Sequence, residues 1–554
     1  MEKTQKGRKA FKSQSVIQIW FPYNPSDLAK VKTLEGRRFH KTPKPHWIAQ
    51  ITVSNIEQLQ EWGFEVDPEL LNMTDGIKGS VEDAKEIEFD FGHLENILMP
   101  FQKDGVKFIH TKNGRALIWD EMGLGKTIQA LAYIQCTPEV KKALIIVPAS
   151  LKLNWAREVK MWMTDFDLFL CSGKKHKNTE AIVKDKAPIQ EIYVINYDIL
   201  ADWATYLKTF EFDIVIADES HKLKNNNAKR TKAGKALGSR ADKFLALSGT
   251  PIENRPIEFY NTLNMVQPMV FGDWWKYAST YCGLKRTPWG LDYQGASNTD
   301  QLHKIVTETC MLRRKKADVL KDLPPKVRSV VPLEMSNTKQ YQKAEEDFIS
   351  WLRENKGASA AKKAANAEQL ARIEILKQLC WKGKKKAAKE WIADFIDGNG
   401  KLVIFATHTI TLDFLEEEFP EISVRVDGSV SGENRDKAVQ EFQHNDEIRL
   451  FLGNIKAAGI GLNLVAASAT CFVELDWTPA VHDQAEDRVH RIGQEADSIN
   501  AYYLVCQGTI EDEIMSLLDK KREIVESVLD GTEVKEESMF SELIKKYEKE
   551  EEMV

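Results

Sequence analysis

The segment Asp120-Glu-Met-Gly-Leu-Gly-Lys-Thr127 decides the fold of this chain. It follows a short apolar run, 116–119, that suits a buried strand, and it leads into a run, 127–134, that is typical of a helix. Glycines between a strand and a helix let backbone N–H groups turn toward an anion at the helix N-terminus. The segment therefore predicts a phosphate-binding loop in an α/β fold.

Each position of this loop has an expected role. Lys126 is placed to reach the β- and γ-phosphates of a nucleotide triphosphate, and Thr127 is placed to ligate Mg²⁺. The remaining residues of the predicted nucleotide-binding loop are Asp120, Glu121, Met122, Gly123, Leu124 and Gly125. The general pattern has glycine where this chain has Asp120, and this departure leaves open the alternative of a tight turn without a ligand.

A second apolar run ends in acidic residues. Residues 212–217 form a near-continuous apolar stretch, as expected of a parallel strand that is buried on both faces, and Asp218-Glu219-Ser220-His221 follows it. Ligands of open α/β sheets lie beyond the carboxyl ends of the strands. Asp218 is thus expected to hold Mg²⁺ and Glu219 to polarise the attacking water, the alternative being an acidic helix cap.

Gln484-Ala-Glu-Asp-Arg-Val-His-Arg-Ile-Gly-Gln494 is the second decisive segment. We interpret it as a polar helix start in which a spacing of three places Arg488 and Arg491 on one helical face. Guanidinium groups neutralise the charge that develops when a phosphate bond is cleaved. The distance in sequence between this segment and the phosphate loop predicts a site built between two lobes.

Several blocks together resemble the SWI/SNF-type superfamily-2 ATPases. Residues 218–221, 247–254 and 484–494 resemble motifs II, III and VI of that family, and Asp120 is similar to the family's own variant of motif I. The other blocks, in the expected order, are 98–106, similar to the adenine-reading Q motif; 145–151 with Asn154-Trp155, similar to motif Ia; 401–405, similar to motif IV; and 459–464, similar to motif V.

This resemblance implies ATP and Mg²⁺ as cofactors and two tandem RecA-like lobes with parallel β-sheets, plus a small N-terminal α/β module and a helical C-terminal tail. It implies that Gln102 reads adenine, that Gly461 borders the nucleotide, and that Arg488 and Arg491 act as arginine fingers when the lobes close. The motif III residues Ser248, Gly249 and Thr250 are expected to relay the state of the nucleotide to DNA.

Composition agrees with an intracellular enzyme. The chain has 554 residues, 43% of them hydrophobic, and no apolar run of the length that crosses a membrane. No apolar stretch follows the basic first residues, so we expect no secretion, and seven scattered cysteines indicate reduced thiols. The formal net charge of −6 shows that any DNA contact must come from a local groove.

Composition shifts predict six segments. They are a disordered basic tail at 1–14, a small module at 15–75, a linker at 76–90, an ATP-binding lobe at 91–325, a second helicase lobe at 326–515 and a helical charged tail at 516–554. In the module, 17–21 and 47–53 are predicted strands, 56–64 a helix and 41–45 a turn.

The 15–75 module resembles the HARP domain of annealing helicases, which binds forked DNA. Arg37, Arg38 and Trp47 are its expected DNA contacts, with a generic packing cap as the alternative. A lysine cluster in lobe two supplies two further candidates, Lys384 and Lys385, although a solvated face is the alternative there.

Three functions are consistent with the sequence. The first is a DNA-dependent ATPase that translocates on double-stranded or forked DNA and remodels or re-anneals it, with replication or repair proteins as further partners. The second is an ATP-driven remover of DNA-bound proteins, and the third is a DNA-binding scaffold without enzymatic activity. Lys126, Asp218 and Glu219 are intact and argue against the scaffold.

Overall fold

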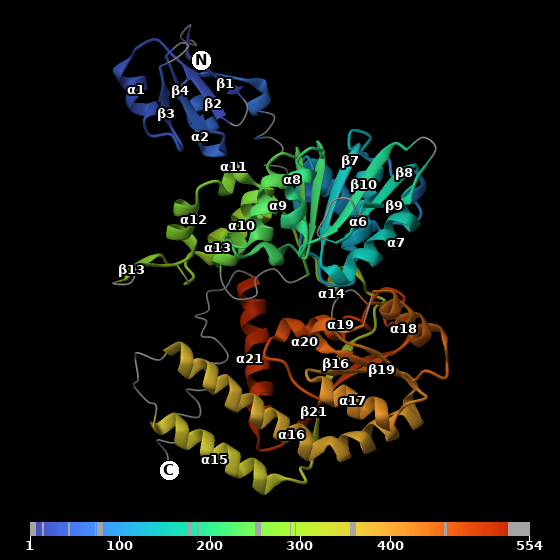
Figure 1. Ribbon diagram of the computed structural model, residues 1–554. Helices are drawn as coiled ribbons and strands as arrows, with labels where there is room; N and C mark the ends of the chain where they lie inside the picture. Colours follow the sequence, from blue (N-terminus) through green and yellow to red (C-terminus); the bar gives the residue numbers. More distant parts are fainter. Residues whose placement is uncertain are drawn as a thin grey trace. The chain divides into compact units, whose positions relative to one another are not determined.

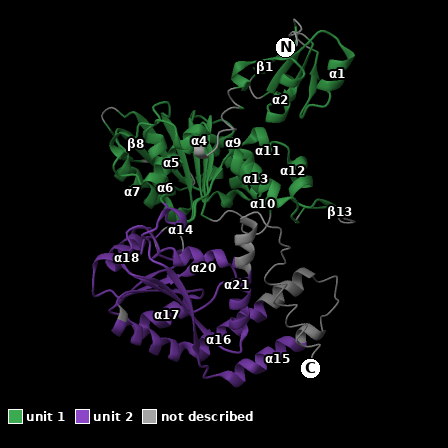
Figure 2. Cartoon of the chain, turned by 180° about the vertical axis from the view of Figure 1, so that it is seen from behind, with its two compact units in different colours: residues 1–121, 125–315 green, residues 122–124, 316–554 purple. Residues whose placement is uncertain are grey.

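The computed structural model describes residues 7–13, 16–41, 45–71, 74, 81–173, 179–185, 188–249, 256–287, 290–293, 295–354, 362–430, 432–458 and 462–529. The chain divides into two compact units (Figure 2). Unit 1 comprises residues 1–121 and 125–315, and unit 2 comprises residues 122–124 and 316–554. Each unit contains a large parallel sheet with its own hydrophobic core, which agrees with the predicted α/β class.

A small α/β module opens unit 1 (Figure 1). Its strands lie in the order β3-β4-β2-β1-β5, and its two helices bury Ile17, Ile19 and Ala49 on one face of the sheet. The elements are β1 (Lys9–Ser13), β2 (Val16–Trp20), α1 (Pro25–Val31), β3 (Arg38–His40), β4 (His46–Gln50), α2 (Val53–Glu61) and β5 (Glu65–Val66). The predicted strands and helix of the module are confirmed, with shifted ends, while the centre of the expected turn, 42–44, lies outside the described residues.

The expectation of disorder over residues 1–14 is wrong for residues 9–13. Lys9–Ser13 forms β1, which pairs antiparallel with β2 and parallel with β5. The cause is a long-range one, because Ala10 is buried in the core of the module while Lys9 and Lys12 pair with Glu65 and Glu69. Because the strand is short and rich in charged residues, its sequence did not indicate that it would pair with other strands.

The module is attached to the next part of unit 1. Met269 of α11 (Pro268–Phe271) belongs to the module's hydrophobic core. Lys276 of α12 (Trp274–Tyr281) forms an ion pair of 2.5 Å with Glu35. The module therefore also packs as a cap on this part of the chain.

Lobe one is built on a sheet in the order β15-β6-β12-β11-β7-β10-β8-β9. All neighbouring strands are parallel except the edge pair β8 and β9. The strands are β6 (Arg115–Ile118), β7 (Lys142–Val147), β8 (Phe166–Cys171), β9 (Thr179–Val183), β10 (Gln190–Asn196), β11 (Ile214–Asp218), β12 (Lys243–Leu247) and β15 (Met311–Leu312). The wholly buried apolar run of β11 explains its central place, because helices cover both faces of a parallel sheet.

The helices of lobe one alternate with these strands. They are α4 (Val81–Lys85), α5 (Pro100–Thr111), α6 (Lys126–Gln135), α7 (Lys152–Trp162), α8 (Leu200–Leu207), α9 (Lys229–Gly238), α10 (Pro256–Val266) and α13 (Thr299–Thr309), and a hairpin of β13 (Lys285–Thr287) and β14 (Gly290–Asp292) precedes α13. The strand and the helix predicted on either side of the phosphate loop are confirmed as β6 and α6.

Unit 2 contains a sheet in the order β16-β21-β20-β17-β19-β18, in which all pairs are parallel. Its strands are β16 (Lys326–Leu333), β17 (Leu402–Ala406), β18 (Ser423–Val426), β19 (Leu450–Asn454), β20 (Ala469–Phe472) and β21 (Ile499–Cys506). Its helices are α14 (Lys316–Val319), α15 (Thr338–Glu354), α16 (Lys362–Asn399), α17 (Thr409–Glu418), α18 (Gly432–His444), α19 (Ile455–Ala458), α20 (Pro479–Glu486) and α21 (Ile510–Leu529).

Three expected boundaries differ from the structure. The expected linker 76–90 contains the helix α4, which contacts α5. The second unit begins at Lys316 rather than at 326, because α14 belongs to it. The helical tail begins at Ile510, and residues 530–554 lie outside the described part. Among the described helices, none is both long and apolar enough to cross a membrane.

The DNA-binding role expected for Lys384 is wrong. Its side chain is completely buried, and its ammonium donates to both carboxylate oxygens of Glu511 at 2.7 Å and to the carbonyl oxygen of Leu504 at 2.5 Å. Lys385, in contrast, is exposed. A helix turns consecutive residues to different faces, so a cluster in sequence is not a cluster in space.

Lys384→Ala should therefore act on stability. Removing one partner of a buried ion pair leaves Glu511 uncompensated, which costs about 3–5 kcal/mol of the free energy of unfolding. Lys386→Ala is the matched control, since its side chain is 85% exposed and should change that free energy by less than about 0.5 kcal/mol. Urea denaturation followed by circular dichroism measures both. A Lys384→Ala protein of parent stability that binds DNA more weakly would restore the original assignment.

Candidate nucleotide site

The loop between β6 and α6 has the backbone that the sequence predicts. Gly123 and Gly125 have φ angles of 85° and 74°, in the left-handed region that glycine adopts without strain. Gly125 also stands in a crowded place, because a Cβ atom there would lie 2.4 Å from the amide nitrogen of Gln102. Lys126 and Thr127 follow as the first residues of α6, so the loop ends at a helix N-terminus.

Lys126 folds back over its own loop. Its ammonium donates to the carbonyl oxygens of Asp120 at 2.7 Å and of Glu121 at 3.1 Å. A positive charge held in this position lies beside the backbone N–H groups that follow the two glycines. The arrangement suits an anion that is shared by the loop and the lysine.

Gln102 lies next to this loop at the start of α5. It is buried, and its side-chain oxygen accepts a hydrogen bond of 3.0 Å from the backbone N–H of Met99, which caps the helix. The contact with Gly125 brings the Q motif and the phosphate loop together. The adenine-reading role of Gln102 stays a prediction.

Asp218 ends β11 at the carboxyl edge of the sheet and is buried. Its carboxylate accepts hydrogen bonds from the indole N–H of Trp155 at 2.8 Å and from the backbone N–H of Glu219 at 2.9 Å. Burial and the neighbouring Glu219 raise the pKa of Asp218 to about 6, although Trp155 and Lys126 act in the opposite direction. Two adjacent buried carboxylates facing a lysine are typical of a catalytic centre.

Glu219 is held in an unusual backbone conformation. Its φ of 49° lies in the left-handed region, which is strained for a residue with a side chain and is found mostly at functional sites. One carboxylate oxygen lies 3.5 Å from the Ser248 hydroxyl and 3.3 Å from the His221 ring. The expected motif II and motif III residues thus meet in this lobe. Gly249 follows Ser248, whereas Thr250 lies outside the described residues.

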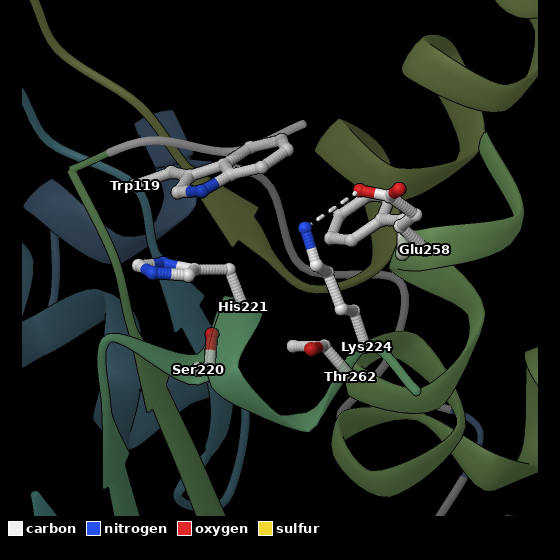
Figure 3. Close-up of a pocket in the computed structure, with 7 residues that line it drawn as sticks. Trp119, Ser220, His221, Lys224, Glu258 and Thr262 are labelled. Carbon is white, nitrogen blue, oxygen red and sulfur yellow. Dashed lines mark hydrogen bonds and ion pairs between the residues drawn. The ribbon is translucent and has the colours of Figure 1, made fainter. Parts of the chain in front are cut away.

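A small cavity lies behind these residues (Figure 3). Its volume of about 10 Å³ is close to the smallest space that holds one water molecule, so it is no substrate pocket. Figure 3 shows Lys224 extending toward Glu258, with which it forms an ion pair of 3.4 Å. The lining residues are Trp119, Ser220, His221, Lys224, Glu258, Phe259 and Thr262.

The arginines of unit 2 do not lie on a helix, so the expected shared helical face is wrong. Helix α20 ends at Glu486, and Arg488 and Arg491 occupy the turns that follow. Beyond Glu486 the backbone hydrogen bonds leave the helical pattern, because the N–H of Arg488 donates to the carbonyl oxygen of Ala485 and that of Arg491 to the carbonyl oxygen of Val489. Gln494 donates to the carbonyl oxygen of Val489 at 2.9 Å, and Lys316 donates to that of His490 at 2.8 Å.

Both guanidinium groups are nevertheless anchored in the same way. The Nε atoms of Arg488 and Arg491 each donate, at 2.9 Å, to the carbonyl oxygen four residues earlier, of Gln484 and Asp487. Arg488 is buried and Arg491 is partly exposed. Their finger role stays a prediction, and Gly461 of motif V lies outside the described residues.

A buried network of charges around Glu486 holds the start of these turns. Glu486 is completely buried and accepts from Tyr503 at 2.7 Å, from Arg328 at 2.7 and 2.8 Å, and from Lys326 at 2.8 Å. Burial by itself would raise the pKa of Glu486, but the cations Lys326 and Arg328 hold it at about 2. The segment is therefore fixed by ionic contacts within its own unit.

Sequence reasoning missed four contacts of the site. Trp155 was noted only as part of a motif, and the Tyr197 hydroxyl, which donates to the Asp218 carbonyl at 2.7 Å, carried no signal. Gln129 and Arg314 both bind the side chain of Asp120. The one available signal was the replacement of glycine by Asp120, because a carboxylate at that position requires a partner.

The expected DNA contacts of the module are distributed over its surface. Arg37 and Arg38 are exposed, and Trp47 is partly exposed and lies in a tilted arrangement against Phe39, with ring centroids 5.3 Å apart. Phe39 itself is 49% exposed. These positions are compatible with a contact to nucleic acid, and their role stays a prediction.

Comparisons with known proteins agree with this geometry. The chain is 31% identical over 543 residues to the Xenopus laevis SWI/SNF-related matrix-associated actin-dependent regulator of chromatin subfamily A-like protein 1, covering 94% of this chain and 54% of that protein. It is 33% identical over 471 residues to the Mus musculus DNA annealing helicase and endonuclease ZRANB3, covering 82% and 43%. The chain thus spans about half the length of these relatives.

A solved structure of the Sulfolobus solfataricus SWI2/SNF2 ATPase core in complex with dsDNA is 25% identical, with a TM-score of 0.37, and covers 78% of this chain and 93% of that one. The helicase conserved C-terminal domain matches residues 383–493. The SNF2-related domain matches residues 101–384, more than half of the chain, and the protein therefore belongs to the SNF2-related family.

Proposed function

We propose that this protein is an ATP hydrolase that is stimulated by DNA, moves along double-stranded or forked DNA, and remodels or re-anneals it. The convergence of Lys126, Asp218 and Glu219 at the carboxyl edge of one sheet carries the proposal. Relatives whose names include a DNA annealing helicase support the DNA-directed part. An intracellular location belongs to the same proposal, and seven free cysteines support it.

The residues present fit a nucleotide with a bound Mg²⁺. Thr127 and Asp218 offer a hydroxyl and a carboxylate, the oxygen ligands that Mg²⁺ prefers, and the adjacent buried charge of Glu219 favours a cation. When bound, the ion would neutralise charge on the phosphate oxygens. Lys126 binds the β- and γ-phosphates, Gln102 contacts the adenine, and the loop N–H groups hold the phosphate oxygens.

Glu219 is the proposed base. Its carboxylate is fixed by Ser248 and His221, so it can orient a water molecule for attack on the γ-phosphate. The same Ser248 contact connects motif III to the hydrolytic centre. Arg488 and Arg491 of lobe two are the proposed arginine fingers. In this role they neutralise the charge that develops on the γ-phosphate during hydrolysis.

We propose that the DNA contacts come from the module and from lobe two. Arg37, Arg38 and Trp47 of the module and Lys385 of lobe two are the candidates that remain after Lys384 is excluded. Backbone contacts imply little sequence specificity and a strong dependence on salt. Exposed aromatic rings and cations on one small module, such as Phe39 and Arg38, suit the unpaired bases at a fork.

A phosphate-release assay with single-stranded, duplex and forked DNA at one stated salt concentration tests the function. We expect ATP turnover to rise on duplex or forked DNA. Turnover that is the same with and without every DNA of the panel would exclude the DNA-dependent part while leaving the ATPase in place. A Lys126→Ala control excludes a contaminating enzyme.

Lys126→Ala and Glu219→Gln should each abolish turnover for different reasons. Lys126→Ala removes a phosphate ligand, so nucleotide affinity should fall, whereas Glu219→Gln keeps the shape of the site and should keep that affinity. Fluorescent-nucleotide titration and phosphate release separate the two effects. A Glu219→Gln enzyme with the parent turnover rate would show that the base is another group.

Arg491→Ala should keep nucleotide and DNA binding but lose turnover by about 10³-fold or more, the scale of known arginine fingers. Its guanidinium is partly exposed, so the protein should remain folded. Single-turnover hydrolysis at saturating DNA measures the effect. Normal DNA-stimulated turnover in this variant would rule out a finger role.

Arg38→Glu should reduce the preference for forked over plain duplex DNA without changing basal turnover. Lys32→Glu is the matched control, because Lys32 is equally an exposed cation of the module but lies at the end of α1. The readout is the ratio of ATPase rates on fork and duplex. An equal ratio for Arg38→Glu, Lys32→Glu and the parent would mean that the module serves as a packing cap.

A further inference from the structure

Asp120 begins the phosphate loop with a carboxylate that has no access to water. A charge in such a place is stable only when cations and hydrogen-bond donors surround it. The side chain cannot itself bind a phosphate, because like charges repel. Any effect of Asp120 on the loop must therefore act through the groups that bind its carboxylate.

Those groups form a closed network. The Arg314 guanidinium binds Asp120 through two nitrogens, with Nε 2.9 Å from Oδ1 and Nη2 against Oδ2. Gln129 of α6 donates to the same Oδ2 at 3.1 Å and accepts from Arg314 Nη2 at 2.8 Å. Such a bidentate pair fixes direction as well as distance.

The backbone adds a second connection at the same point. Strand β15 runs parallel to β6, and the carbonyl oxygen of Arg314 accepts the backbone N–H of Glu121 at 3.0 Å. Asp120 and Glu121 are the residues whose own carbonyl groups hold the Lys126 ammonium. A line of direct contacts therefore leads from Arg314 through the first two loop residues to Lys126.

The surroundings of the network are crowded. Arg314 also donates to the carbonyl oxygen of Phe101, and its guanidinium lies 5.3 Å from the Phe101 ring centroid. At Gly105 of α5, a Cβ atom would lie 1.9 Å from Gln129 Oε1 and 2.9 Å from Arg314 Nη2. Helix α5 thus needs glycine there to make room for the network.

We propose that Arg314 is a positioning residue for nucleotide binding, which acts by clamping Asp120 and so fixing the phosphate loop and Lys126. The proposal rests on the nucleotide-binding function proposed above. Arg314 is also the second-last residue of unit 1 before the chain enters unit 2 at Lys316.

Two conservative variants test the clamp. Arg314→Lys keeps the charge but offers a single ammonium in place of a planar fork, and Asp120→Asn keeps the shape without the charge. We expect each to weaken nucleotide affinity by about 10- to 100-fold, the usual scale for a residue that orients a ligating group. Affinity is measured with a fluorescent nucleotide under conditions in which circular dichroism shows each variant to be folded.

Arg115→Gln is the matched control for a purely structural arginine. Arg115 is as deeply placed in the same lobe, but its guanidinium donates to the carbonyl oxygens of Val266 at 3.0 Å and Met265 at 2.6 Å at the opposite end of β6. This variant should lose thermal stability and keep the parent nucleotide affinity. Parent affinity in folded Arg314→Lys and Asp120→Asn would overturn the clamp.

Amide hydrogen exchange separates the clamp from the proposed function. If Arg314 fixes the loop, the amides of residues 121–127 exchange at least several-fold faster in Arg314→Lys than in the parent and in Arg115→Gln. This readout needs no nucleotide, so a parent protein that fails to bind ATP would refute the function and leave the clamp to be judged by exchange. Unchanged exchange in the loop would refute the clamp even in an active ATPase.

Discussion

A carboxylate that is removed from water must be met by cations or by several hydrogen-bond donors, and the functional parts of this molecule depend on that constraint. Asp120 is met by Arg314 at the phosphate loop, and Glu486 by Lys326 and Arg328 below the motif VI turns. In lobe two, Glu511 is met by Lys384. In the first two cases the ion pair fixes a segment that carries or adjoins one of the motifs, whereas the third pair connects α16 to α21.

The acidic pair at the end of β11 is the exception that indicates catalysis. Burial and mutual repulsion raise the pKa of Asp218 to about 6, so the donors around it do not fully compensate its charge. Glu219 adds a strained backbone conformation. A protein keeps such a costly arrangement where a ligand or a reaction will use it, and in the proposed function a metal-bound nucleotide would supply the missing positive charge.

The sequence predicted what depends on local pattern. Apolar runs located β6 and β11, and the two glycines of the phosphate loop indicated its turns. It did not predict what depends on distant partners. Arg314 and Asp120 are separated by 194 positions, and Lys384 and Glu511 by 127, so neither pair leaves a pattern in a window of neighbouring residues.

The motif VI turns show the same limit. A spacing of three predicts a shared helical face only if the helix continues, and here α20 ends at Glu486 and the backbone N–H groups of Arg488 and Arg491 donate outside the helical pattern. The residue types predict a finger role for the two arginines, which stays a prediction, whereas their geometry could not be predicted from the sequence. Turns that are held by side chains can place two guanidinium groups independently, which a regular helix does not allow.

Internal use of cations also explains why net charge says little about DNA binding. Lys401 and Arg449 donate to carbonyl groups near the ends of α18 and α16, and Arg115 donates to the carbonyl group of the last residue of α10 and to one that follows α9. These cations, like Lys384 and Arg314, form contacts within the fold. Counterion release counts only the charges that contact phosphates. The salt dependence of DNA affinity therefore measures the number of phosphate contacts, whereas the overall charge of −6 does not.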